Sequence, residues 1–139
     1  MIVDANNQVL GRLATYVAKQ ALSGESVNVI NCEKVLISGD RSKVFEKIRH
    51  SRNDRGEPFH GPFISRMPDR LVRRMIRGML PFKQARGREA FKRIMCYMGV
   101  PKEFEGKDAV KPKGADASKL PNLKFVRIEE VSRMLGAKI

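Results

Sequence analysis

A strand, a helix and a second strand open the chain, and this order restricts the fold more than any other feature. Residues 2–5 are a short strand candidate, and residues 27–31 form a strand rich in β-branched side chains. Between them, apolar residues recur at the spacing of an amphipathic helix: Leu10, Leu13, Ala14, Val17, Ala18, Ala21 and Leu22. Strand, helix and strand within about thirty residues is the pattern of a parallel βαβ unit. The sequence therefore predicts the α/β class.

Shorter elements follow in the rest of the 139 residues. Residues 35–37 are a strand candidate, and residues 125–128 form a last apolar run. A helix that turns Val44, Phe45 and Ile48 inward is expected between residues 40 and 49. A chain of this length can bury a core without disulfides or a structural metal. We expect a single domain over residues 1–139, with a projecting basic loop at 49–66 and a polar extension at 102–121.

The clearest helix in the centre of the chain should begin at Pro68. Proline has no backbone N–H, and the N–H of the first helical residue would have no partner within the helix. Asp69 then suits the positive end of the helix dipole. At about 100° per residue, the helix has an apolar and a basic side. The expected apolar side holds Leu71, Val72, Met75, Ile76 and Met79, and the basic side holds Arg70, Arg73, Arg74 and Arg77.

Positive charge is concentrated around this helix. The chain carries a net charge of +13, and residues 41–93 alone hold 16 Lys and Arg against five Asp and Glu. A surface that only faces solvent usually mixes positive and negative side chains. A planar guanidinium group can donate two parallel hydrogen bonds to the oxygens of one phosphate. The pattern favours a nucleic-acid partner over an ordinary solvated surface.

The basic loop at 49–66 contains two aromatic rings, Phe59 and Phe63, and both histidines of the chain, His50 and His60. The rings either stack on unpaired bases or pin the loop to its own domain, and the sequence leaves both alternatives open. The histidines lack a cluster of cysteines or carboxylates at ligand spacing, so we interpret them as hydrogen-bonding or RNA-contacting groups.

The sequence gives no sign of membrane insertion, secretion or catalysis. Its apolar runs are too short to span a bilayer, and its first residues lack the basic and apolar regions of a signal peptide. Cys32 and Cys96 are predicted to be buried, reduced thiols of a cytosolic protein. The phosphate-binding glycine loops and carboxylate clusters of nucleotide-binding enzymes and nucleases are missing. We expect no enzyme activity, no cofactor, no metal and no small-molecule substrate.

Several motifs resemble the universal large-subunit ribosomal protein thirteen family, in its archaeal and eukaryotic branch. The similarity covers nearly the whole chain, and residues 102–120 align least well. Its motifs are Asp4-Ala5, Leu10-Gly11-Arg12-Leu13-Ala14, Val29-Ile30-Asn31-Cys32-Glu33-Lys34, Ile37-Ser38-Gly39, Arg73, Arg77-Gly78-Met79-Leu80-Pro81, Arg86-Gly87 and Tyr97-Met98-Gly99-Val100-Pro101. The bacterial N-terminal addition and His-Thr-Gly loop and the eukaryotic C-terminal extension are missing, so an archaeal source is inferred.

This resemblance implies a three-layer α/β/α domain around a mainly parallel four-stranded sheet. It also implies a non-enzymatic protein of the cytoplasmic large ribosomal subunit that supports subunit assembly. The implied partners are large-subunit ribosomal RNA and neighbouring large-subunit proteins. Two alternatives remain: a regulator that binds mRNA or DNA away from the ribosome, and a nucleic-acid-processing enzyme.

The resemblance and the charge pattern together assign RNA contacts to two groups of cations and to the two histidines. Phosphate contacts give affinity without reading sequence, so RNA shape, 2′-hydroxyls and unpaired bases should provide specificity. The first group is Arg70, Arg73, Arg74, Arg77, Lys83, Arg86, Arg88, Lys92 and Arg93. The second is Arg41, Lys43, Arg49, Arg52, Arg55 and Arg66, and the histidines are His50 and His60.

Overall fold

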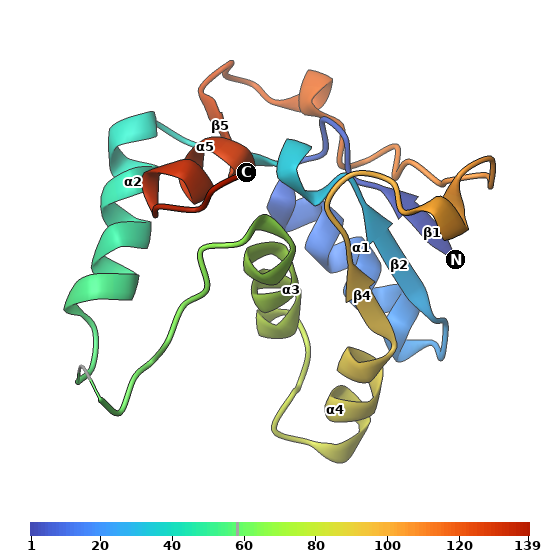
Figure 1. Cartoon of the computed structure of the whole chain (residues 1–139). Coiled ribbons are helices and arrows are strands. Elements are labelled where there is room, and N and C mark those ends of the chain that lie inside the picture. The colour runs from blue at the N-terminus through green and yellow to red at the C-terminus, as the bar shows by residue number, and fades with distance from the viewer. Residues whose placement is uncertain (58) are drawn as a thin grey trace.

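The computed structural model describes residues 1–57 and 59–139; Pro58, within the basic loop, lies outside the described residues. The N-terminal unit consists of β1 (Ile2–Asp4), α1 (Leu10–Leu22) and β2 (Val27–Ile30). β1 and β2 pair in parallel, with Val3 opposite Val29 (Figure 1). The predicted βαβ unit is therefore confirmed.

The chain continues through the remaining helices and strands in an α/β order. These are β3 (Leu36–Ser38), α2 (Arg41–Arg49), α3 (Pro68–Gly78), α4 (Ala85–Lys92), β4 (Ile94–Cys96), β5 (Phe125–Arg127) and α5 (Ile128–Met134). A π-helical turn, η2 (His50–Asp54), extends α2 directly. Short 3₁₀ turns lie at Cys32–Lys34, Lys102–Phe104 and Ala117–Lys119.

Within residues 1–57 and 59–139 the strands form two sheets, where a single four-stranded sheet was expected. One is a parallel sheet in the order β1-β2-β4, and the other pairs β3 with β5 in antiparallel orientation. Beside β1, the fourth position holds only an isolated parallel bridge between Val3 and Val110. The α/β class and the mainly parallel pairing are confirmed, whereas the four-stranded detail needs this correction. A single bridging residue inside a polar segment cannot continue the ladder.

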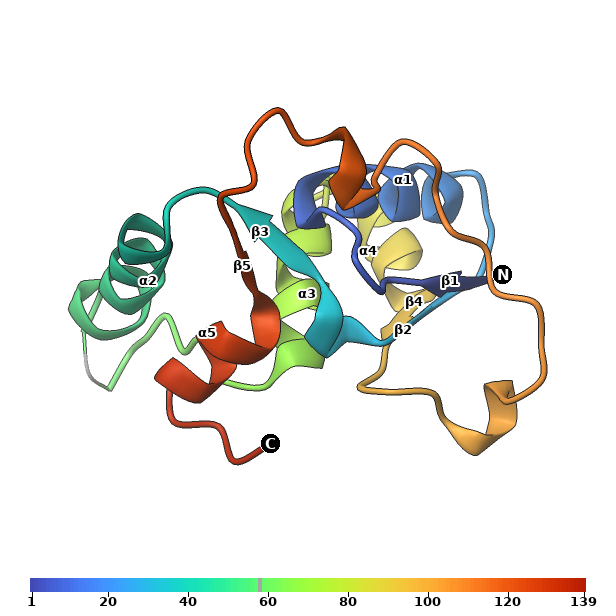
Figure 2. The same cartoon turned by 90° about the horizontal axis from the view of Figure 1, so that it is seen from above.

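Helices cover one face of the parallel sheet. Val3, Val29 and Cys96 lie in register and are buried. They belong to one apolar cluster with residues of α1 and α4, the helices that Figure 2 shows beside this sheet. In the next row, Ile2 and Asn28 are half-buried and Met95 is 40% exposed. The second helical layer implied by the resemblance lies instead against the antiparallel pair, where α2 and α5 contact β5.

The predicted apolar face of α1 forms the centre of the core. Six of its seven residues are buried, and Leu22 at the C-terminal end is the exception. α3 and α4 both pack against this helix. Residues from β1 to α5 belong to one continuous apolar cluster, which fixes α3 and α4 relative to each other and so positions the basic surface.

Asp4 at the end of β1 joins three segments of the chain. Its Oδ1 accepts hydrogen bonds from Asn31 Nδ2 at 2.9 Å and from the Asn6 backbone N–H at 3.0 Å. Lys111 Nζ lies 3.2 Å from Oδ2. Burial alone would raise the pKa of this carboxyl, but the hydrogen bonds and Lys111 together lower it below its ordinary value.

We expect Asp4→Asn to flatten the acid limb of the stability profile. Because the folded pKa of Asp4 is lowered, its carboxylate stabilises the fold above about pH 4 and loses this contribution as the pH falls further. Urea unfolding of the unmodified protein and of Asp4→Asn from pH 6 to pH 2 measures the effect. Equal losses of unfolding free energy in the two proteins over this range would contradict the role of Asp4.

Candidate nucleic-acid interface

α3 begins as predicted, with Pro68 in its first turn and Asp69 beside the positive end of the dipole. Leu71, Val72 and Ile76 are buried, which confirms three of the five residues of its expected apolar side. Met75 and Met79 were expected inward, and this was wrong: they are 47% and 49% exposed. The helix packs on α1, β4 and α5. These neighbours do not cover the part of its surface that carries the two methionines.

The arginines of α3 do not form one free stripe. Arg70 is exposed, but the Arg73 guanidinium lies 4.6 Å from the centre of the Phe91 ring, and the Arg77 guanidinium lies 5.0 Å from that of Phe82. Arg73 Nε is buried and has no hydrogen-bond partner within the described part of the chain. Stacking occupies the face of a guanidinium and leaves its N–H edge able to donate. The rings therefore orient these cations.

Arg73 should also contribute to stability, so Arg73→Ala is expected to lower the unfolding free energy by about 2 kcal/mol through loss of the Phe91 contact and of buried side-chain stem. The control is Arg70→Ala on the same helix, which should change it by less than about 0.5 kcal/mol because Arg70 is exposed. Chemical denaturation compares the two variants. Equal effects would show that the stacking contributes nothing.

α4 and the turn before it present further cations. Lys83, Arg86, Arg88 and Lys92 are exposed, while Ala90 and Gly87 are buried. Gly87 lies against the preceding turn so closely that a Cβ there would be 2.1 Å from the Pro81 carbonyl oxygen. Arg93 turns back and donates to the Ala21 carbonyl at 3.4 Å. The turn and α4 thus add four exposed cations to Arg70.

The second predicted group of cations is divided between surface and internal contacts. Arg41 pairs with Glu130 at 3.3 Å. Arg52 and Arg66 each donate at 3.3 Å to backbone carbonyls, of Leu135 and Gly136 respectively. These three tie the basic loop and α2 to the C-terminal segment. The remaining members, Lys43, Arg49 and Arg55, are exposed.

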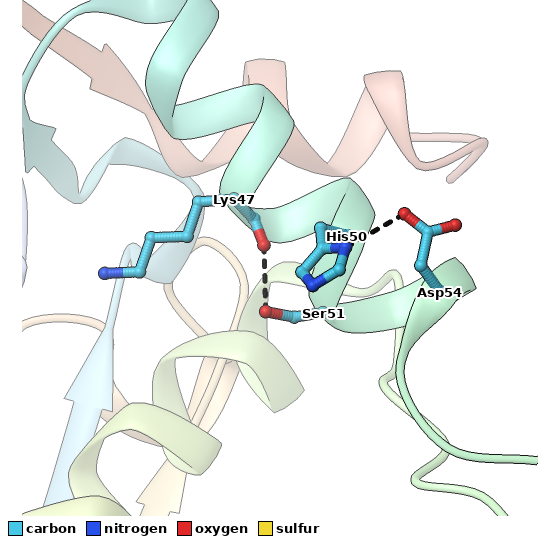
Figure 3. A network of polar contacts seen from close by, with 4 residues as sticks. All are labelled: Lys47, His50, Ser51 and Asp54. Carbon is cyan, nitrogen blue, oxygen red and sulfur yellow. Dashed lines mark hydrogen bonds and ion pairs between the residues drawn. The ribbon is translucent and has the colours of Figure 1, made fainter.

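Both histidines lie beside carboxylates of their own segment. Figure 3 shows His50 next to Asp54, with 3.1 Å between Nδ1 and Oδ2, and Ser51 donating to the Lys47 carbonyl at 2.8 Å. His60 lies 3.1 Å from Glu57 in the same way. The first contact lies within the turn after α2 and the second within the basic loop, and both imidazoles remain exposed.

Phe59 and Phe63 are 91% and 72% exposed. Of the two alternatives for these rings, the structure therefore disfavours pinning of the loop to its own domain. A tight turn brings Glu57 and Gly61 together through two backbone hydrogen bonds. Gly56, with φ +83°, approaches the Gly61 carbonyl so closely that a Cβ would lie 2.0 Å from the oxygen. Phe59 lies in the chain between Glu57 and Gly61, the two hydrogen-bonded residues.

Besides the basic surface of α3 and α4, the protein has a second basic region, a groove between α1 and the segment after β4. The sequence prediction missed this second basic groove. It has a volume of about 420 Å³ and is lined by Arg12, Lys19, Lys113 and Tyr16. Arg12 donates to the Gly114 carbonyl at 3.4 Å. The available signal was the pair Arg12 and Lys19, seven residues apart on one helix face, but nothing in the sequence brings Lys113 to that face.

Within the described residues, no group of three or more His, Cys, Asp or Glu is placed to hold a metal. The same residues contain no helix long and apolar enough to cross a membrane. Cys32 and Cys96 are free and buried, as predicted. The Cys96 thiol and burial raise the pKa of Cys32, which therefore stays protonated and unreactive.

Comparisons with known proteins agree with the resemblance noted above. The family model described as ribosomal protein L13 matches residues 1–103. Large ribosomal subunit protein uL13 of Methanococcoides burtonii is 44% identical over 137 residues, which cover 99% of this chain and 98% of the relative. The uL13 of Methanopyrus kandleri is 46% identical, with 97% and 86% covered. That of Natronomonas pharaonis is 40% identical, with 100% and 92% covered. All three organisms are archaea.

Proposed function

Because the chain belongs to the ribosomal protein L13 family, we propose that it is a structural constituent of the large ribosomal subunit. In this role it binds large-subunit ribosomal RNA in the cytoplasmic ribosome, contacts neighbouring ribosomal proteins and supports subunit assembly. The relatives are named as ribosomal proteins and the family is not an enzyme family. The proposed role is binding, without catalysis.

The observation that carries this proposal is the set of exposed cations on α3, α4 and the turn between them. Arg70, Lys83, Arg86, Arg88 and Lys92 are exposed, and the acids of these two helices are only Asp69 and Glu89. Arg73 and Arg77 are held beside them by aromatic rings. Such a surface attracts the phosphates of a folded RNA through counterion release.

The remaining predicted residues receive more specific proposed roles. Lys43, Arg49, Arg55 and Arg74 add phosphate contacts from the α2 side. His50, His60, Phe59 and Phe63 meet unpaired bases, because exposed aromatic rings stack on them. Arg41, Arg52, Arg66 and Arg93 already contact other parts of the chain, so their contribution is to hold the basic elements in place.

We further propose that residues 1–139 act as one unit in which the polar segment 102–121 meets RNA or a neighbouring protein. Support comes from its attachment to the N-terminal unit. Val110 bridges to Val3, and Asp116 bridges to Gln8. These bridges hold Lys113 beside α1, where it lines the second basic groove.

Sedimentation of a cell extract tests the proposed function. Epitope-tagged protein should sediment with the large subunit and stay there after a wash in about 0.5 M salt, which screens exposed charge contacts to within a few ångströms. A chain that remains mainly in the ribosome-free supernatant would contradict the proposal and favour the regulator of mRNA or DNA.

A further inference from the structure

An open groove with a mainly apolar lining lies between α2 and α3. It has a volume of about 450 Å³, and the β3 region and α5 complete its walls. Its exposed lining is mainly apolar, contributed by side chains such as Ile37, Ile48, Ile64 and Met75. Met75, the residue wrongly expected in the core, lines this groove and is 47% exposed.

α2 is incompletely packed without something in the groove. Of its nine residues only Val44 is buried, while Phe45 and Ile48 are half-buried. A helix of this length is not stable alone and depends on packing of its apolar face. In Figure 1, α2 lies apart from α3 at one side of the molecule. An apolar occupant would bury Ile48 and Met75 together and fix α2 against the rest of the domain.

The rim of the groove is positively charged. Lys43, Lys47, Arg55 and Arg74 line it, and Asp40 is its only acidic lining residue. α2 already forms one ion pair of this kind within the chain, because Arg41 lies 3.3 Å from the carboxylate of Glu130 in α5. The rim thus suits an occupant that carries negative charge beside an apolar stripe.

Two kinds of ribosomal partner carry negative charge, and the lining distinguishes between them. RNA phosphates would satisfy the rim cations but leave the branched aliphatic floor without a matching surface, and the floor offers no aromatic ring for a base to stack on. A protein segment with apolar residues on one face and acids at the edges satisfies both parts.

We propose that this groove is the docking site for an acidic, apolar segment of a neighbouring ribosomal protein. The segment places aliphatic side chains on Ile48, Ile64 and Met75, and one of its carboxylates pairs with Lys47. This inference rests on the proposed function, because the partner is a component of the same subunit.

Site-directed crosslinking in the assembled subunit tests the inference. The full chain carrying Met75→Cys is labelled with a benzophenone maleimide, reconstituted into large subunits and irradiated. Labelling is selective because Cys32 and Cys96 are buried. We expect a crosslink to a protein segment that contains acidic residues next to apolar ones. Leu123→Cys, 89% exposed and outside the groove lining, is the control and should not crosslink to that segment.

A change of rim charge then tests the electrostatic part. Lys47→Glu in the Met75→Cys background should reduce the crosslink yield about tenfold, and Lys47→Gln should reduce it less, while both variants still enter the subunit. A crosslink to RNA, to a segment without acids, or to nothing would overturn the inference. If Met75→Cys does not assemble, Ile64→Cys on another wall gives the same readout. Failure of the unmodified chain to assemble would instead contradict the proposed function.

Discussion

Replacing Arg70, Arg86, Arg88 and Lys92 together by Ala should lower affinity for large-subunit ribosomal RNA about a thousandfold at 0.1 M salt. These four side chains are exposed on α3 and α4. Each lost phosphate contact should reduce the slope of log K against log salt by about 0.7 to 0.9. Loss of four contacts therefore reduces the slope by about three. The difference in affinity between the two proteins then grows by about three orders of magnitude for each tenfold decrease of salt below 1 M. Filter binding over a salt series measures both quantities.

The control for this variant removes the same charge from another part of the surface. Lys34, Lys124, Arg127 and Lys138 are also exposed, and their replacement by Ala should change the slope by less than about one. If both quadruple variants lose affinity equally, net charge alone explains binding and the α3 and α4 surface has no special role.

Gly87→Ala is expected to lower the free energy of unfolding by about 3 kcal/mol, although alanine normally stabilises a helix relative to glycine. The reason is a backbone contact. A Cβ at position 87 would lie 2.1 Å from the Pro81 carbonyl oxygen and 2.4 Å from its carbon. No side-chain rotation relieves such a contact, so α4 must move away from the turn. Because α4 carries Arg86, Arg88 and Lys92, RNA affinity should fall as well.

Gly78→Ala is the matched control, since Gly78 is the last residue of α3 and a Cβ there would meet nothing within 4 Å. We expect it to be neutral or to stabilise the protein by up to about 1 kcal/mol. Urea denaturation of the two variants gives the comparison. Similar stability of Gly87→Ala and Gly78→Ala would show that the turn adapts without cost.

Local patterns in the sequence were sufficient to predict α1, the start of α3 and the parallel βαβ unit. Each depends on residues close together in the chain: the 3.6-residue spacing of α1, the Pro68-Asp69 start and the β-branched run in β2. The family motifs then predicted the mainly parallel α/β class. These features follow from local propensity and burial, which a single sequence contains.

The errors concern contacts between distant segments. Periodicity gives the direction of a helix's apolar side but not how much of it neighbouring elements cover, so Met75 and Met79 were assigned to the core. Arg73 was expected to point freely outward because nothing local indicates that Phe91 of α4 lies beneath it. Likewise, the contacts of Arg12 with Gly114 and of Arg52 with Leu135 span 102 and 83 positions of the chain.

The most direct test of the central claim is binding of the purified chain to large-subunit ribosomal RNA, with small-subunit ribosomal RNA as competitor, across a salt series. A defined site combines phosphate contacts with the shape of one folded RNA, so a preference for the large-subunit RNA should persist as salt rises. Equal affinity for both RNAs, lost in parallel with increasing salt, would contradict the account and describe a general polyanion binder.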